Sequence, residues 1–479
     1  MSGDQYDVVV IGAGPVGENV ADGAVKGGLS VAIVESELVG GECSYWACMP
    51  TKALLRDVSA LRAVQHLPAA AAAVTGTLDP AAVLARRDRF ASNWDDAGQV
   101  SWLESAGVDL VRGHGRLTGT RSVSVTAADG TVQELTARHA VVVATGTSAA
   151  VPPIPGLADA QPWTSREAVA ADHVPDRLAI IGGGVVGTEM ATAYSALGSD
   201  VTFIVRDGVL PNVEPYASQL VIVSLEAAGV RVMLGASPAQ VRRDLGGTVH
   251  VTLEDGETID ADEVLIATGR KPNTGDLGLE TVGLAPGAWL AVDETLRVTG
   301  ADGAALGDGW LYAAGDVNRR VLLTHQGKYQ ARAVGEVVVA RATGAPVDDA
   351  PWGRHVATAD HSAVPQVVFS SPEVVSVGHT VASAAAAGLT VRVAEYDLGA
   401  VAGAALHADG YTGRASLLVD DERDVVVGFT AVGSDTTELV HAATIAITGE
   451  VPIDRLWHAV PAYPTISEVW LRLLETLGR

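Results

Sequence analysis

The two cysteines of the chain, Cys43 and Cys48, have the type and spacing that redox chemistry requires. Two thiols with four residues between them can store two electrons as a disulfide and release them, because a thiolate attacks a neighbouring disulfide sulfur. A disulfide across so short a loop adds little stability, and no second cysteine pair completes a zinc site. We therefore predict a redox-active dithiol and no metal site, over the alternatives of a stapled loop or two inert buried thiols.

A dinucleotide-binding fingerprint precedes the cysteines. The apolar run 6–11 is typical of a strand buried on both faces, and it leads into a glycine turn, a helix over 18–26 and a strand over 30–34. The glycines of the turn are Gly12, Gly14 and Gly17. They permit a tight turn, close approach to a pyrophosphate, and close packing of helix on strand. Glu35, after the second strand, can accept hydrogen bonds from a ribose.

The same unit recurs later in the chain, with a strand over 178–181, a helix to Leu197 and a strand over 201–205. The glycines of this second turn are Gly182, Gly184 and Gly187. Such internal repetition indicates two separate dinucleotide sites.

The two units differ at the end of the second strand, where Glu35 of the first corresponds to Val205, followed by Arg206. An acid there favours a free 2′-hydroxyl, whereas an arginine can pair with a 2′-phosphate. The first unit therefore suits the adenosine of FAD, and the second favours NADPH over NADH, with NADH still possible. An ordinary solvated charge is the alternative for Arg206, and the stretch offers no second arginine nearby.

The charge and hydropathy of the 479-residue chain exclude some classes of partner. Its net charge is −25, which argues against nucleic acid or an anionic membrane surface. No run of about 20 apolar residues predicts a membrane-spanning helix, and the N-terminus lacks the pattern of a signal peptide. We expect a soluble cytoplasmic protein with no membrane insertion.

Together these features resemble the class I pyridine nucleotide-disulfide oxidoreductases, a family that includes dihydrolipoamide dehydrogenase, glutathione reductase and mercuric reductase. The resemblance covers nearly the whole chain. It rests on the two glycine turns, the cysteine stretch from Gly41 to Lys52, and a C-terminal stretch over 364–373. Further short motifs of the family, which it uses around its cofactors, contain Thr145, Gly146, Gly269, Arg270, Gly315 and Asp316.

The resemblance and the element pattern imply an α/β fold with two Rossmann-like dinucleotide-binding domains and a C-terminal α+β dimerisation domain. A proline-rich stretch near 151–156 is a natural boundary. The predicted domains are the first part of an FAD-binding domain over 1–150, an NAD(P)-binding domain over 151–280, the second part of the FAD-binding domain over 281–350, and the dimerisation domain over 355–479.

The family also implies a route for electrons, from NAD(P)H to the flavin and from the flavin to the Cys43–Cys48 disulfide. Cys43 would be the thiol facing the substrate and Cys48 the thiol beside the flavin. Asp316, which follows a predicted strand, matches a ligand to the ribityl chain of FAD. Lys52 and Glu189 match an ion pair near the flavin, although Glu189 is equally interpreted as an acid favoured by the helix dipole.

One departure limits how far the function transfers. The family's disulfide reductases place a general acid/base histidine where this chain has Tyr463, while the glutamate that follows it is present as Glu468. An imidazole, with a pKa of about 6.5, exchanges protons at neutral pH, whereas a phenol, at about 10, does not. Bulky Tyr45 and Trp46 between the cysteines either offer a stacking surface for a flat substrate or simply pack.

Three functions remain open at this stage, each with FAD and a small-molecule electron acceptor in a homodimer. One is a thiol–disulfide reductase with altered proton handling, and another is a reductase of a quinone-like acceptor, which tolerates loss of the histidine better. We favour the second slightly. The third is a flavin-binding redox sensor with little turnover, which the intact Cys43, Cys48 and Lys52 argue against.

Overall fold

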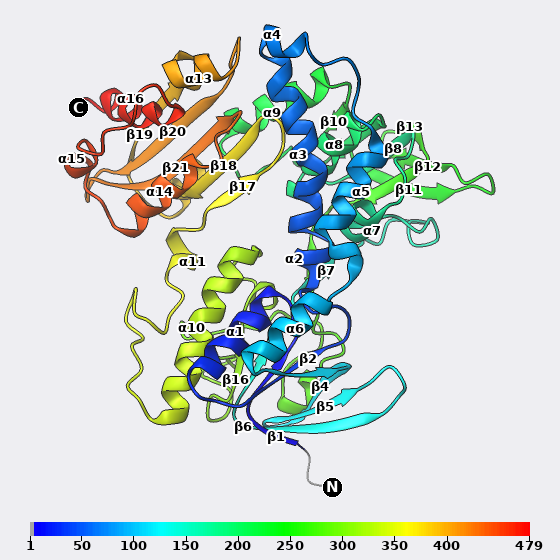
Figure 1. The fold of residues 1–479 in the computed structure, drawn as a ribbon, viewed down its shortest axis with the longest axis vertical. Helices are drawn as coiled ribbons and strands as arrows, with labels where there is room; N and C mark the ends of the chain where they lie inside the picture. Colours follow the sequence, from blue (N-terminus) through cyan, green and yellow to red (C-terminus); the bar gives the residue numbers. More distant parts are fainter. Residues whose placement is uncertain (1–3) are drawn as a thin grey trace. The chain divides into compact units, whose positions relative to one another are not determined.

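The computed structural model describes residues 4–479 and divides the chain into two compact units. Unit 1 comprises Met1–Met49, Asp88–Ser148 and Arg270–His361. Unit 2 comprises Pro50–Arg87, Ala149–Gly269 and Ser362–Arg479. Figure 1 labels the elements of both units, which we describe one at a time.

Unit 1 is built on a seven-stranded sheet, β3-β2-β1-β6-β5-β4, with β16 also paired to β6. The parallel strands are β1 (Asp4–Ile11), β2 (Val31–Glu35), β3 (Asp109–Arg112), β6 (Val132–Val143) and β16 (Leu311–Ala313). Two antiparallel strands, β4 (His114–Gly119) and β5 (Ser122–Thr126), complete it. The carboxyl ends of β1, β6 and β16 therefore meet at one edge, where ligands bind in such sheets.

Strand β6 contains two stretches, 132–136 and 140–143, that the segment 137–139 separates in the sequence. One strand of 12 residues runs through both stretches. Its first half pairs with β5 and its second half with β16, while β1 pairs along both. A change of partner in mid-strand has no local signature in the sequence.

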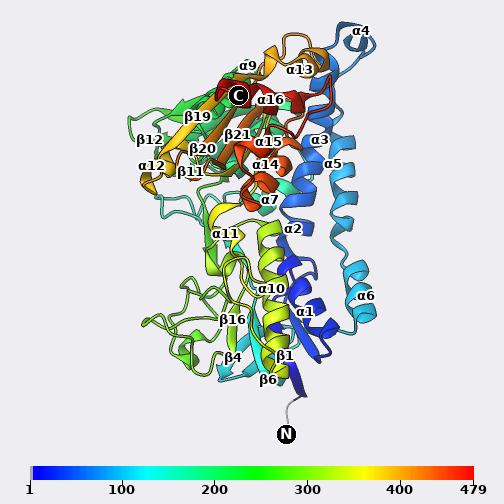
Figure 2. The ribbon, with the colours of Figure 1, turned by 90° about the vertical axis from the view of Figure 1, so that its left-hand side faces the viewer.

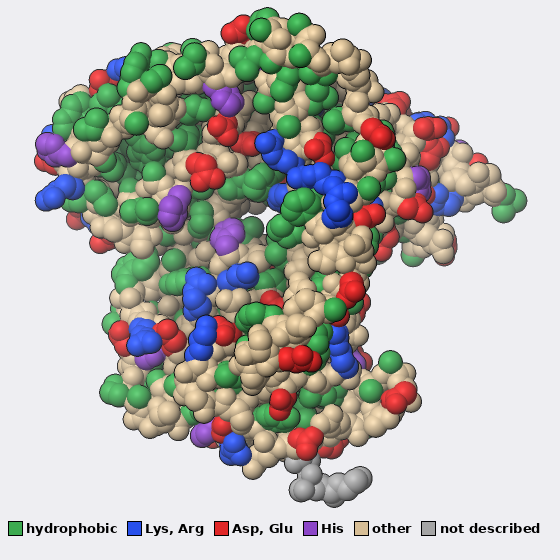
Figure 3. All heavy atoms as spheres, in the orientation of Figure 1, with side chains coloured by type: hydrophobic (Ala, Val, Ile, Leu, Met, Phe, Trp, Pro, Cys, Tyr) green, Lys and Arg blue, Asp and Glu red, His purple; other side chains and the backbone are tan. Residues whose placement is uncertain are grey.

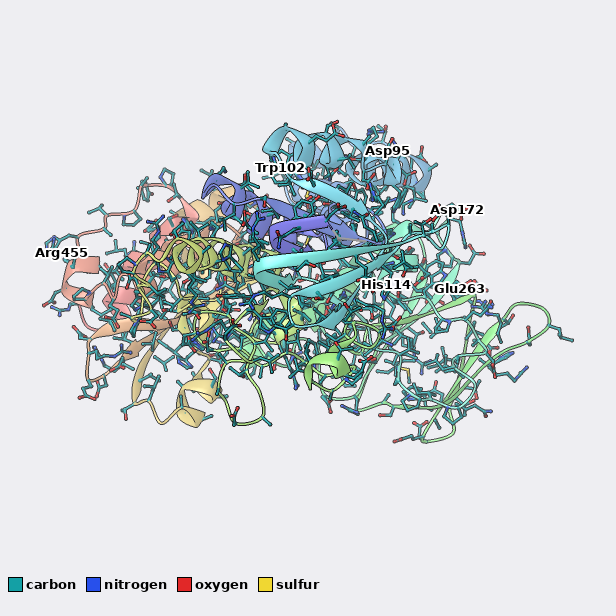
Figure 4. The ribbon with its side chains drawn as sticks, turned by 90° about the horizontal axis from the view of Figure 1, so that it is seen from below. Asp95, Trp102, His114, Asp172, Glu263 and Arg455 are labelled. Carbon is teal, nitrogen blue, oxygen red and sulfur yellow. The ribbon has the colours of Figure 1, made fainter. Side chains whose placement is uncertain are left out.

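Three helices cover one face of this sheet: α1 (Pro15–Lys26), α6 (Ala97–Ala106) and α10 (Thr324–Thr343). They share a core with the strands, to which Val20, Leu103 and Val334 contribute. Helices α1 and α10 lie side by side in both ribbon views (Figures 1 and 2). In Figure 4, the label of Trp102 marks the position of α6. The N-terminal ends of α1 and α10 carry the backbone N–H groups that favour anions.

The cysteine stretch forms two successive helices, α2 (Gly41–Tyr45) and α3 (Cys48–Gln65). Cys43 lies in the short first helix, and Cys48 is the first residue of the long second one. A helix start is a position that stabilises a thiolate.

Unit 2 contains the second dinucleotide fold. Its parallel sheet runs β10-β9-β8-β14. The strands are β8 (Arg177–Ile181), β9 (Asp200–Val205), β10 (Arg231–Leu234) and β14 (Glu263–Ile266), with α8 (Val185–Ala196) after β8 and α9 (Pro215–Ala227) after β9. A three-stranded antiparallel sheet is added by β11 (Pro238–Arg243), β12 (Val249–Leu253) and β13 (Thr258–Ala261).

The C-terminal part of unit 2 is a five-stranded antiparallel sheet, β17-β18-β21-β20-β19. Its strands are β17 (Gln366–Val368), β18 (Glu373–Gly378), β19 (Val391–Asp397), β20 (Arg414–Asp420) and β21 (Val425–Gly433). Helices α14 (Leu439–Thr448) and α16 (Val469–Thr476) contact it. The predicted fold class, two Rossmann-like domains and an α+β C-terminal domain, is confirmed.

Short elements join these layers. They are α4 (Pro68–Ala71), α5 (Pro80–Phe90), β7 (Thr147–Ala149), α7 (Ser165–Ala170), β15 (Arg270–Pro272), α11 (Ala359–Ser362), α12 (Val381–Ala386), α13 (Ala402–His407) and α15 (Ile453–Leu456). Within residues 4–479, no helix combines the length and apolar character needed to cross a bilayer.

Candidate functional site

The glycine turn after β1 has no room for side chains at two of its three glycines. Gly12 has φ +103°, and a Cβ there would lie 2.5 Å from the carbonyl oxygen of Ala144. A Cβ on Gly17 would overlap the carbonyl oxygen of Gly12. Gly41, at the start of α2, would bring its Cβ within 2.9 Å of Gly14 Cα. The helix that carries Cys43 therefore packs directly on the turn, and this contact requires glycine at position 41.

Two features of the turn fit a bound pyrophosphate. A Cβ on Gly14 would have no neighbour closer than 4.0 Å, so the protein itself does not require glycine there. The hydroxyl of Thr145, at the end of β6, is buried and has no hydrogen-bond partner among the described residues. The space beside Gly14 and the unpaired hydroxyl of Thr145 both lie at the carboxyl edge of the sheet. A phosphate group bound there would fill that space and accept a hydrogen bond from Thr145.

Glu35 lies where an adenosine ribose would be recognised. Its carboxylate accepts hydrogen bonds from the backbone N–H of Ala13, at 2.7 Å, and of Glu37, at 2.8 Å. Burial raises the pKa of this carboxyl above its ordinary value. Each oxygen keeps a second lone pair, so Glu35 can shape the turn and accept from a ribose hydroxyl.

Asp316 follows β16 and faces one other predicted site residue, Arg270, together with Thr147, which the sequence analysis missed. The hydroxyl of Thr147 donates to it at 2.7 Å, and burial raises its pKa. Arg270 donates to the same hydroxyl at 2.5 Å and lies 3.9 Å from the Asp316 carboxylate. Arg270, expected from a motif of the second unit, thus belongs to unit 1. The backbone N–H of Gly315, beside Asp316, donates to the side-chain oxygen of Gln330 at 2.7 Å.

Two glycines of the remaining motifs take left-handed backbone conformations. Gly146, with φ +66°, accepts from the backbone N–H of Asn273 at 3.1 Å. Gly269, with φ +133°, accepts from the N–H of Ala150 at 2.9 Å. They are turn residues of β6 and β14 respectively, and no ligand is needed to explain them.

Cys43 and Cys48 are thiols in contact with each other. Their mutual hydrogen bond, followed by burial, raises the pKa of the Cys43 thiol. The hydroxyl of Thr324, the first residue of α10, lies 3.3 Å from the Cys48 sulfur and also hydrogen-bonds to Cys43. The positive charge of Lys328, one turn further along α10, lowers the Cys43 pKa in opposition. Sequence analysis missed Thr324 and Lys328, which no motif marks.

The donor set of unit 1 fits FAD. The open turn and Thr145 would hold the pyrophosphate, Glu35 the ribose, and Asp316 the polyol chain, with the cysteine pair beside them. Bound FAD supplies a two-electron carrier between a nicotinamide and the dithiol. The protein's own part is to hold the dinucleotide on α1, to keep the two sulfurs in contact, and to place Thr324 and Lys328 against them.

The second glycine turn repeats the geometry of the first. Gly182 has φ +116°, and a Cβ on Gly187 would overlap the Gly182 carbonyl oxygen. A Cβ on Gly184 would have nothing within 4 Å. Arg206 is exposed and ion-paired at 2.7 Å with its neighbour Asp207, so any 2′-phosphate must compete with that carboxylate.

Lys52 and Glu189 form the expected ion pair, at 2.8 Å, within unit 2. Glu189 is 2% exposed, and its other oxygen accepts from the backbone N–H of Phe369 at 3.0 Å. The Lys52 ammonium lies 5.0 Å from the centre of the Phe369 ring. Glu189 stands beyond the first turn of α8, so the ion pair explains it and the helix dipole does not.

Tyr463 is 77% exposed on the C-terminal domain. Glu468 is buried and accepts from Arg472 at 2.5 Å, while its Oε2 atom has no hydrogen-bond partner among residues 4–479. His458 is exposed beside a 460 Å³ surface cavity that Asp454 and Arg455 also line (Arg455 is labelled in Figure 4). None of these contacts brings Tyr463 to another titratable group of its own unit.

The aromatic residues between the cysteines have different environments. Tyr45 is fully buried, donates to the carbonyl oxygen of Val39 at 3.0 Å, and meets Trp46 edge-on at 5.7 Å between ring centres. Tyr45 therefore packs, and offers no stacking surface. Trp46 is half-buried.

Comparisons with known proteins identify the family of the chain. The family model described as "Pyridine nucleotide-disulphide oxidoreductase" matches residues 6–344, and the model of that family's dimerisation domain matches residues 364–473. The dihydrolipoyl dehydrogenase of Rhizobium etli is 30% identical, with 99% of each chain covered. That of Chlorobaculum tepidum is 32% identical, over 97% of this chain and 95% of its own.

Solved structures show the same fold. LpdA from Mycobacterium tuberculosis superposes with a TM-score of 0.82 at 27% identity, with 99% of both chains covered. The flavoprotein disulfide reductase RclA from Escherichia coli gives a TM-score of 0.81 at 24% identity, over 98% of this chain and 99% of its own. With nearly the full length matched in sequence and in structure, the chain belongs to the pyridine nucleotide-disulphide oxidoreductases, a family of flavoenzymes.

Proposed function

We propose that this protein oxidises NAD(P)H and passes two electrons, through FAD, to the Cys43–Cys48 disulfide and on to a small-molecule acceptor. The observation that supports this most directly is the contact between the two sulfurs, of which Cys43 lies on α2, the helix that packs on the glycine turn. NAD(P)H, one proton and the disulfide become NAD(P)⁺ and two thiols. The thiols then return two electrons and two protons to the acceptor and reform the disulfide.

The same proposal includes a nicotinamide preference and a homodimer. Val205 in place of an acid, with Arg206 beside it, favours NADPH over NADH. The dimerisation domain exposes Leu406, Ile445, Trp457, Val460 and Tyr463. Figure 3 shows hydrophobic side chains gathered over this domain. We assign that surface to a second copy of the chain, because apolar patches of this kind mark protein interfaces.

A thiol count tests the electron route. The anaerobic holoenzyme is given NADPH, denatured, and its thiols are titrated. We expect two new thiols per subunit in the wild type. We expect none in Cys43→Ser, because Cys48 then has no second cysteine with which to form a disulfide. Flavin that stays oxidised under excess NADPH and NADH would leave only a flavin-binding sensor.

The acceptor has two candidates. Lipoamide is favoured by the similarity of the chain to dihydrolipoyl dehydrogenases, such as that of Rhizobium etli at 30% identity. A quinone-like acceptor is favoured by Tyr463, because a quinone needs no histidine to protonate a thiol leaving group.

Steady-state rates with lipoamide, glutathione disulfide and a naphthoquinone separate the two acceptors. We expect the naphthoquinone to be reduced fastest, and Tyr463→His to raise the disulfide rates alone. Efficient lipoamide turnover by the wild type would reject the quinone-like acceptor, and unchanged disulfide rates in Tyr463→His would show that the tyrosine is not the limit.

A further inference from the structure

Gln330 holds the loop that carries Asp316. It is a fully buried residue of α10. Its side-chain oxygen accepts two hydrogen bonds, from the backbone N–H of Gly315 at 2.7 Å and from the side-chain amide of Asn318 at 2.8 Å. Gly315 precedes Asp316 directly, and Asn318 follows it by two residues. One oxygen atom therefore fixes the loop on both sides of the acid that we assign to the polyol chain of FAD.

The amide of Gln330 has one orientation that suits its neighbours. The backbone N–H of Gly315 can only donate, so the amide must present its oxygen to the loop and its nitrogen to the opposite side. There the nitrogen donates to the carboxylate of Asp360 at 2.8 Å. The Asp360 side chain is 1% exposed and lies on the short helix α11. Asp360 therefore holds Gln330 in the orientation that the loop requires.

Other neighbours compensate the charge of Asp360. Gln326, one turn before Gln330 on the same face of α10, donates to the second carboxylate oxygen at 3.0 Å. The guanidinium of Arg320 lies 3.9 Å from the carboxylate. Burial raises the pKa of Asp360, while the two amides and Arg320 act in the opposite direction. Asp360 thus accepts from two amides of one helix, and the amide of Gln330 continues the chain of hydrogen bonds to the loop.

We propose that Gln330 is a positioning residue for FAD and that Asp360 holds its amide in place. The pair fixes the loop before the dinucleotide binds, so the carboxylate of Asp316 meets the polyol hydroxyls without a rearrangement. Gly315 has φ +78°, which side chains rarely adopt, and the hydrogen bond to Gln330 helps to hold that conformation. The role rests on the assignment of Asp316 to FAD and adds two residues, Gln330 and Asp360, that touch no part of the dinucleotide themselves.

An exchange of the two side-chain groups tests the pair. Gln330→Glu places a second carboxylate against Asp360, and Asp360→Asn lets the Gln330 amide turn its nitrogen towards the loop. Each single variant should raise the dissociation constant of FAD about tenfold, the effect of one lost hydrogen bond. The double variant restores every donor and acceptor, because the new carboxylate faces the loop and the new amide donates to it. It should bind FAD within about twofold of the parent.

Ultrafiltration of serially diluted holoenzyme measures the dissociation constant without any turnover, since the flavin absorbance of the filtrate gives free FAD. Gln326→Met is the matched control, because it removes the other amide from Asp360 and leaves the contacts of Gln330 with the loop. It should lower the temperature of thermal unfolding and leave the dissociation constant unchanged. If Gln330→Glu fails to fold, Asp360→Asn and Gln326→Met decide the question, since the first should weaken FAD binding and the second should not.

A further substitution shows whether Gln330 acts through Asp316. Asp316→Ala by itself should raise the dissociation constant about tenfold. Gln330→Glu should then add nothing, because the loop no longer carries the carboxylate that it positions. Three results would overturn the proposal: single variants with the parent affinity, a double exchange as weak as its two single variants combined, or a Gln330→Glu effect that survives in Asp316→Ala.

The outcome is separable from the assignments on which it rests. Asp316→Ala with the parent affinity would reject the polyol contact, and the positioning role with it. Weak FAD binding by Asp316→Ala, with the parent affinity in Gln330→Glu and Asp360→Asn, would reject the positioning role alone. Formation of two thiols by NADPH in the FAD-loaded parent tests the electron route independently of either result.

Discussion

At the scale of single residues, the two acids predicted to contact the cofactor, Glu35 and Asp316, already have hydrogen-bond partners in the protein. Glu35 accepts two backbone N–H groups, and Asp316 accepts from Thr147. Their pKa values are raised by burial, so ligand hydrogen bonds would offset a cost that the protein bears without them. Arg206 differs, because Asp207, with which it forms an ion pair, is also largely exposed. It can exchange that partner for a phosphate at little cost.

Replacing Arg206 tests the nicotinamide preference at this scale. Arg206→Ala should raise the KM for NADPH about tenfold, the loss of one charge-assisted contact, and leave the KM for NADH unchanged. Steady-state kinetics with both nucleotides and one acceptor measure the split. Asp207→Asn is the matched control, since it frees Arg206 and should lower the KM for NADPH. Equal changes for both nucleotides would show that Arg206 does not contact a 2′-phosphate.

At the scale of elements, the first glycine turn contains one glycine that helix packing requires and one that helix packing does not require. The third glycine, Gly17, is needed for α1 to pack on the turn, because its Cβ would overlap the Gly12 carbonyl oxygen. The second glycine, Gly14, has an ordinary φ of −71° and space around its Cβ position. We propose that the path of a bound dinucleotide is the reason why Gly14 carries no side chain.

Alanine variants should therefore differ in which property they lose. Gly17→Ala should destabilise even the FAD-free protein, by about 1–3 kcal/mol of steric strain. Gly14→Ala should leave the FAD-free protein as stable as the parent yet abolish FAD retention, because the methyl group occupies the ligand's path. Thermal unfolding of the apoprotein and the flavin absorbance of the purified protein measure the two. Full FAD retention by Gly14→Ala would place the pyrophosphate elsewhere.

The ion pair of Lys52 and Glu189 belongs to the same scale, since it joins α3 to α8 within unit 2. The buried Glu189 also accepts from the backbone next to β17. One carboxylate thus holds three segments that are distant in sequence. No local sequence pattern predicts an ion pair between Lys52 and Glu189. It was expected only because the chain resembles a known family.

At the scale of the whole molecule, the C-terminal domain contains buried polar atoms that its own fold does not satisfy. Glu468 Oε2 and Trp470 Nε1 have no partner within residues 4–479. Around the same segment, Val460 is 84% exposed and Tyr463 77% exposed. In a single subunit, an interface shows buried polar atoms without hydrogen-bond partners and exposed apolar side chains, because the second subunit covers both.

A charge placed in that surface should dissociate the homodimer. Val460→Asp buries a carboxylate at an interface, at a cost of about 3 kcal/mol, which weakens dimerisation about a hundredfold. Sedimentation velocity over a range of protein concentrations measures the change. Leu245→Asp is the matched control, because Leu245 is fully exposed in the turn between β11 and β12 and should leave the dimer intact. A Val460→Asp protein that stays dimeric would move the interface to another surface.

The sequence alone determined the features that depend on neighbours along the chain. The two glycine turns, the strands that flank them and the pairing of Cys43 with Cys48 all follow from short spacings and from the period of apolar residues. These local constraints act within a few residues, and the structure places each of them as expected. Most motifs of the family occur in this chain in the family's order. Each motif is a short local pattern, so the sequence was enough to identify the fold class.

Only the tertiary structure decided which distant residues meet. It joined Arg270 to Thr147 and Asp316, made β6 one strand with three partner strands, and buried Tyr45. It also brought Thr324, at the start of α10, to 3.3 Å from the Cys48 sulfur. Burial and charge sharing depend on contacts between segments hundreds of residues apart, and no spacing in the sequence encodes them.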